Sequence, residues 1–138
     1  MDNIINSKNM KNILQQAGCN TPASEAQIKL CNVKLKQHGF PELPEGFAKV
    51  LLEANGLTAD DANIFGVGLE EGGWFDDVCD YNIKHCQAPS KRLVLGYDDD
   101  TRLIYYAEEK LYRVESEMGK DMESNDVIEA LEYFLRIQ

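Results

Sequence analysis

Several features that mark whole classes of protein are missing from this sequence. No apolar run approaches the ~20 residues that a membrane-spanning helix needs, so no membrane insertion is expected. The segment Met1–Asn6 has no basic stretch followed by an apolar stretch, which is the pattern of a secretory signal. The sequence therefore predicts a cytoplasmic protein.

Cysteines are few, and their spacing matches no known ligand pattern. Cys19, Cys31, Cys79 and Cys86 form no C-x-x-C pair, which excludes the usual zinc and thioredoxin-type motifs. Cys79 and Cys86 with His85 would need a distant fourth ligand to hold zinc. We expect free thiols that are buried or half-buried, no metal site and no other cofactor.

Basic residues are scarce compared with acidic ones. Lys and Arg together number 14 against 24 Asp and Glu, which gives a net charge of −10 and a pI near 4.6. Such a chain repels phosphate, so we expect no nucleic-acid partner. It would attract a basic protein partner, although solubility alone also accounts for an acidic surface.

The motifs of common enzyme classes are also absent. There is no G-x-S-x-G elbow, and the adjacent His85 and Cys86 would point to opposite faces of a strand. Gly66-Val67-Gly68 lacks the third glycine of a phosphate-binding loop, and two glutamates follow it. Asp76–Asp80 lacks the glycine and the alternation of a calcium loop. We predict no catalytic residues and no enzymatic activity.

The most sharply bounded element that is present is a short helix between Leu43 and Leu57. Pro44 suits a first helical turn, and Glu45 places a negative charge at the positive end of the helix dipole. Asn55-Gly56 is expected to end the helix as its C-terminal cap. One apolar stripe runs along it: Phe47, Val50, Leu51 and Ala54.

Three further helices are expected. A weak pattern over Asn3–Gln16 predicts a marginal helix that ends near Gly18. Ser24-Glu25-Ala26-Gln27 is a capping box that opens a second helix, which Gly39 ends. A last helix is expected to begin with Ser124 as its cap and Asp126 in its first turn.

Between these helices the sequence predicts strands and loops. Thr58–Asn63 is predicted to be a polar loop, Ile64–Val67 a strand and Gly68–Phe75 a glycine-rich loop. Asp76–His85 is ambiguous and could hold a helical turn followed by a strand around Tyr81 and Ile83.

The following segment predicts an antiparallel meander. Its strands are Arg92–Tyr97, Leu103–Tyr106 and Leu111–Val114, and Leu93, Leu95 and Tyr97 should share one face. The triple aspartate Asp98–Asp100 forms the first turn. Gly119–Glu123 is expected to be a loop.

The order of helices, then strands, then a helix predicts an α+β fold in a single domain over residues 1–138. We expect an antiparallel sheet of about four to six strands, flanked by N-terminal helices and a C-terminal helix. Residues 1–20 should form a peripheral helix on a core of residues 21–138.

The best candidate for function is the acidic loop that carries the only Trp. Acidic residues beside exposed aromatic ones are typical of partner recognition. A solvated loop, or Trp74 buried as part of the core, stays an alternative. So does a small hydrolase or ligand-binding site that uses carboxylates near Trp74, which would need a closed cleft and a desolvated acid. The candidate partner-binding residues are Glu70, Glu71, Trp74, Phe75, Asp76, Asp77 and Asp80.

Taken in order, the segments resemble a known superfamily. They are Pro22–Ile28, Leu43–Phe47, Leu51-Leu52, Asn55–Leu57, Ile64–Gly66, Leu93–Asp98, Leu103–Tyr106, Tyr112–Val114 and Tyr133–Leu135. This set is similar to the SUKH superfamily, and within it to the YrhA-like bacterial branch. The resemblance extends from about Pro22 to the C-terminus.

The resemblance implies an α+β fold and a non-enzymatic, protein-binding role. Bacterial relatives are thought to be largely immunity proteins that neutralise polymorphic or contact-dependent toxins, and yeast relatives regulate cell-wall glucan synthesis. A basic toxin domain is the partner that this resemblance and the acidic charge suggest together. The matching residues here, such as Pro44, Gly56 and Gly66, are structural, so no catalytic residue is carried over.

Overall fold

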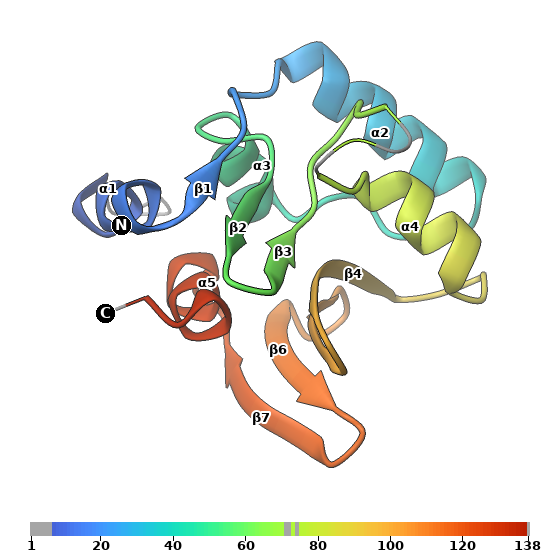
Figure 1. The fold of residues 1–138 in the computed structure, drawn as a ribbon. Helices are drawn as coiled ribbons and strands as arrows, with labels where there is room; N and C mark the ends of the chain where they lie inside the picture. Colours follow the sequence, from blue (N-terminus) through green and yellow to red (C-terminus); the bar gives the residue numbers. More distant parts are fainter. Residues whose placement is uncertain (1–6, 71–72, 74, 138) are drawn as a thin grey trace.

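A computed structural model describes residues 7–70, 73 and 75–137. The described chain contains five helices and seven strands (Figure 1). The helices are α1 (Ser7–Gln16), α2 (Glu25–Gln37), α3 (Glu45–Leu51), α4 (Val78–His85) and α5 (Val127–Leu135). The strands are β1 (Gly18–Cys19), β2 (Leu57–Ala59), β3 (Ala62–Ile64), β4 (Arg92–Asp98), β5 (Thr101–Tyr106), β6 (Leu111–Ser116) and β7 (Gly119–Ser124).

The seven strands form one antiparallel sheet in chain order, from β1 to β7. The α+β class is confirmed, but the sheet has more strands than the four to six expected. Two of the additional strands come from Gly18–Cys19 and from the segment predicted as the polar loop Thr58–Asn63, which forms the β2–β3 hairpin. Figure 1 shows α2 beside α4, and α1 beside α5 near the start of the sheet.

The capping box that opens α2 is confirmed. The Gln27 backbone N–H donates to the Ser24 hydroxyl at 3.1 Å, and the Ser24 N–H donates to the Gln27 side chain at 2.9 Å. The helix ends just before Gly39, whose φ of +85° suits glycine. Local sequence chemistry therefore determines both ends of this helix.

Helix α3 is shorter than its apolar stripe predicts, and its ends differ from the expectation. Pro44 is the N-terminal cap in an extended conformation, and the helix ends at Leu51. The prediction that Asn55-Gly56 forms the C-terminal cap is wrong, because Leu52 is the cap and the Asn55 side chain bonds to the backbone of Val67. This buried asparagine fixes the chain between β3 and α4.

Strand β4 contains a bulge that reverses the predicted face of Tyr97. Val94 pairs with Ile104 and Gly96 pairs with Leu103, so Leu95 is an extra residue between them. Leu95 is buried, and Tyr97 turns to the opposite face, where 38% of it is exposed. The turn at Asp98–Asp100 is confirmed.

Three local predictions after residue 75 are corrected. The strand expected around Tyr81 and Ile83 is instead part of α4. The loop expected over Gly119–Glu123 is the edge strand β7. Helix α5 is capped by Asp126, whose carboxylate accepts from the Ile128 N–H at 2.9 Å, and not by Ser124, which ends β7.

The core lies between the inner face of the sheet and the helices. Helix α5 crosses the sheet so closely that a Cβ on Gly96 would lie 3.2 Å from the Phe134 ring. Residues 1–20 were expected to be peripheral, yet Met10 and Ile13 are buried in the core. Among the described residues, no helix is long and apolar enough to cross a membrane.

Candidate functional site

The acidic loop and the first turns of α4 border a small groove of about 160 Å³. The loop is anchored to the end of the Ile64–Gly66 segment, because the Gly66 N–H donates to the Asp76 carbonyl at 2.9 Å and the Val78 N–H donates to the Gly66 carbonyl at 2.8 Å. The predicted site residues that line the groove are Glu70, Phe75, Asp76, Asp77 and Asp80. Glu71 and Trp74 lie outside the described residues.

The Asp77 carboxylate accepts two hydrogen bonds from the backbone beside this groove. One carboxylate oxygen accepts from the Asp80 N–H at 3.0 Å, which caps α4, and the other accepts from the Leu69 N–H at 3.1 Å. These bonds join Leu69 to the start of α4. Since both oxygens are engaged, the role of Asp77 is structural.

Phe75 faces inward, toward the chain that follows α3. It is partly buried, and a Cβ on Gly56 would come within 2.8 Å of its ring. Gly56 has a φ of +114°, so glycine is required there both for the backbone conformation and for the space. The ring therefore packs against the chain that follows α3.

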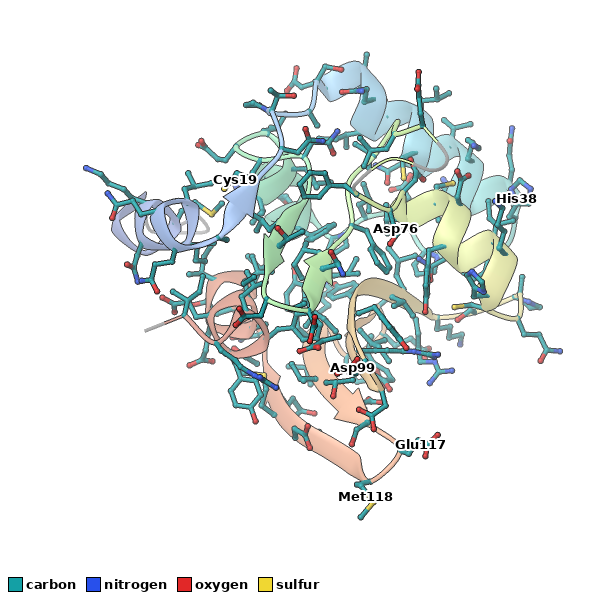
Figure 2. The ribbon with its side chains drawn as sticks, viewed as in Figure 1. Cys19, His38, Asp76, Asp99, Glu117 and Met118 are labelled. Atoms are coloured by element: carbon teal, nitrogen blue, oxygen red, sulfur yellow. The ribbon has the colours of Figure 1, made fainter. Side chains whose placement is uncertain are left out.

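The outward charges of the groove come from Glu70 and Asp76, which are both exposed. Figure 2 shows Asp76 beside the start of α4. The Asp80 carboxylate lies 3.7 Å from the Lys34 ammonium of α2, so part of its charge is compensated. Glu70 and Asp76 therefore present an acidic surface beside α4.

A second, larger hollow of about 570 Å³ lies on the outer face of the sheet, between β4–β6 and the C-terminal end of α4. It was not predicted from the sequence. Val94 and Ile104 form its floor, and both are less than 8% exposed. Around them stand polar side chains, including His85, Cys86, Arg92, Tyr97, Arg102 and Glu117.

One side of the outer sheet face is closed by interactions among its own residues. The Arg113 guanidinium lies 4.3 Å from the centre of the Tyr106 ring and bonds to Glu123 at 2.6 Å. The Tyr106 hydroxyl donates to Glu115. These contacts occupy Arg113, Tyr106 and Glu115, so the hollow is open mainly around β4 and the tips of the hairpins.

A smaller group of aspartates gathers where two hairpin turns meet. Asp60 and Asp99 both adopt a φ near +50°, and together with Asp61 and Asp98 they border a cavity of about 70 Å³. Burial raises the pKa of the Asp98 carboxyl, Arg136 at 3.9 Å opposes this, and the nearby Asp99 and Asp61 add to it. Arg136 therefore only partly neutralises this group.

Comparison with known proteins leaves these surfaces without an assigned role. A scan of protein-family models and a search of curated proteins each find no match to the chain. The resemblance to the SUKH superfamily stays a prediction from the sequence. The role of the site is therefore argued from its side chains.

The four cysteines are free thiols, as predicted, although their exposure varies. Cys31 and Cys79 are buried and Cys86 is half-buried, while Cys19 is exposed, which differs from the expectation. Within the described ranges, no group of three or more histidine, cysteine or acidic side chains could hold a metal ion. Cys86 is the one thiol that borders the hollow.

Proposed function

We propose that this chain is a non-enzymatic, protein-binding module of the cytoplasm that recognises a basic protein. Among such roles, neutralisation of a toxin, or regulation of the kind found in the glucan-synthesis family, fits the resemblance stated above. The observation that carries the proposal is the groove beside α4. It presents the exposed charges of Glu70 and Asp76 beside a backbone contact in which Asp77 joins Leu69 to α4.

An exposed acidic surface suits fast association with a basic partner. The chain carries a net charge of −10, so a basic protein is attracted from a distance and then meets the groove. Asp77 already joins Leu69 to the start of α4, so this part of the backbone loses little conformational entropy when it binds. Both effects support a role in binding for the exposed charges.

The alternative of a carboxylate-based hydrolase has less support. Its acids would need a closed cleft with one carboxyl free and desolvated. The groove is about 160 Å³, which is below the roughly 300 Å³ of ordinary ligand sites. Asp77 is engaged on both oxygens, Asp80 is paired with Lys34, and Asp76 is exposed.

The experiment requires a candidate partner, of which a basic protein encoded by a neighbouring gene is the first choice. Association rates should be measured by stopped-flow fluorescence for the natural protein and for the double variant Glu70→Lys and Asp76→Lys. We expect the rate constant to fall by about five- to tenfold at low salt and much less at high salt, because screening removes the steering.

The matched control is the double variant Asp121→Lys and Glu129→Lys. Both control residues are exposed acids, on β7 and α5, so the net charge changes by the same amount. A slower association in the groove variant alone supports the proposal. An equal effect in both variants, or none in either, contradicts the assignment of the groove as the binding surface.

A further inference from the structure

The hollow on the outer sheet face is bordered by two arginines, although the protein as a whole is acidic. Arg92, Arg102 and Cys86 all border the hollow. Burial raises the pKa of the Cys86 thiol, and the positive charges of Arg102 and Arg92 both oppose that rise. Arg102 likewise opposes the rise that burial causes in the pKa of the Tyr81 hydroxyl. The two arginines come from neighbouring strands, β4 and β5, and both border the hollow, as do His85 and Cys86 at the end of α4.

These two arginines differ from the others in their partners. Arg113 pairs with Glu123, and Arg136 lies 3.9 Å from Asp98. For Arg92 and Arg102, no carboxylate of the described residues lies within ion-pair distance, although Arg92 stands 5.9 Å from the centre of the Tyr106 ring. Two guanidinium groups without an ion pair are well suited to bind a carboxylate from another molecule, since arginine can bind it through two parallel hydrogen bonds.

We propose that the hollow is a second binding surface, which receives a segment of a protein partner that carries an acidic side chain. The carboxylate would lie between Arg92 and Arg102, and neighbouring apolar atoms of the segment would contact Val94, Ile104 and Tyr97. The inference rests on the proposed protein-binding role and adds a second site to it.

The charges around the rim favour a protein segment over a nucleic acid. Asp100 and Glu117 border the hollow from two hairpin turns, and Figure 2 shows Glu117 at the turn between β6 and β7. A chain of phosphates crossing the hollow would meet these acids as well as the net charge of −10. A segment with a single carboxylate can keep that group beside the arginines and away from Asp100, Glu115 and Glu117, with its apolar groups against Val94 and Ile104.

The hollow and the acidic groove lie on the two sides of α4, and His85 borders both. One partner can therefore cover both surfaces across this helix. The groove attracts any basic protein, whereas the hollow selects a basic protein that also carries an acidic residue at the right distance. Opposite charges on adjacent surfaces fix the orientation of a bound partner.

The test is a titration of the isotope-labelled protein, followed by amide NMR at low salt. The probe is the blocked peptide acetyl-Gly-Leu-Glu-Leu-Gly-amide, and the matched probe has glutamine in place of glutamate. We expect the glutamate peptide to shift the amide signals of Val94, Arg102, Ile104 and Ser116, and the glutamine peptide to bind at least about fivefold more weakly.

Variants then identify the residues that are responsible. The double variant Arg92→Gln and Arg102→Gln should weaken binding by about tenfold or more, whereas Arg136→Gln should leave it unchanged. Thermal melting of each variant checks that the fold is intact. Absence of these shifts, equal binding of the glutamine peptide, or equal loss in the Arg136→Gln variant would overturn the proposal.

Two further probes distinguish this proposal from nucleic-acid binding and from the proposal for the acidic groove. A hexathymidylate oligonucleotide that shifts the same amides more strongly than the glutamate peptide would overturn the assignment to a protein segment. A blocked lysine tripeptide should instead shift amides around Asp76. Its failure would count against the acidic groove and leave the result for the hollow standing, so the two proposals can fail separately.

Discussion

Replacement of Asn55 by Ala should lower the free energy of unfolding by about 3 kcal/mol. The Val67 N–H donates to the side-chain oxygen Oδ1 of Asn55 at 2.7 Å, and the side-chain Nδ2 of Asn55 donates to the Val67 backbone carbonyl at 2.9 Å. Asn55 is 4% exposed and Val67 is fully buried. The variant loses both bonds and leaves two buried backbone groups without partners, each of which costs about 1–3 kcal/mol before any water enters.

The measurement is urea unfolding followed by circular dichroism. We expect the midpoint to fall while the slope with denaturant stays the same, since the folded and unfolded states keep their compactness. The control is Asn63→Ala, because the Asn63 amide makes a single 3.3 Å bond to the Asp61 carbonyl at the surface. A loss below about 1 kcal/mol, or one no larger than in the control, would refute the argument that the pair of buried bonds determines the cost.

Two other changes test the loop and the aspartate group. Asp77→Ala should lower stability by about 1–2 kcal/mol, because it removes the cap of α4 and the bond to the Leu69 N–H, and a thermal melt unchanged from the natural protein would contradict this. Asp98→Asn should stabilise the protein at pH 7 but not at acidic pH. The raised pKa of the Asp98 carboxyl in the folded state means that ionisation opposes folding, and that this destabilisation disappears as the pH falls through the folded-state pKa. Urea unfolding at both pH values measures the difference, and an equal change at the two values would contradict the prediction.

Much of the fold could be predicted because local chemistry determines it. Ser24 and Gln27 form their capping box from neighbouring residues alone, and the turn at Asp98–Asp100 needs only the conformational preferences of aspartate. The apolar pattern of α5 also sufficed to place the last helix. Its exact start could not be predicted, because whether Ser124 or Asp126 is the N-terminal cap depends on where β7 ends.

The features that could not be predicted depend on contacts between distant residues. Asn55 has the sequence context of a helix cap, and only its position opposite Val67 gives it another role. The bulge at Leu95 inverts the pattern that placed Tyr97 inside. Strand β7 is polar and lies at the edge of the sheet, so it lacks the alternation of a buried strand.

The candidate site was predicted only in part, because some of its features also depend on contacts between distant residues. Composition and the glycine-rich sequence indicated the acidic loop, and the described members of that set do line one groove. The engagement of Asp77 required the position of Leu69. The hollow was missed because its arginines lie in separate strands, and only the register between Tyr97 and Arg102 brings that part of its wall together.

The order of the strands bears on how the protein is made. Each strand pairs with the strand before it in the chain, so a growing polypeptide on the ribosome can add every new strand to an edge that already exists. Helix α5 follows the last strand, and until it emerges Gly96 and its apolar neighbours lack the cover that Phe134 provides. Synthesis of α5 is therefore the step that removes this apolar face of the nascent sheet from contact with chaperones and other chains.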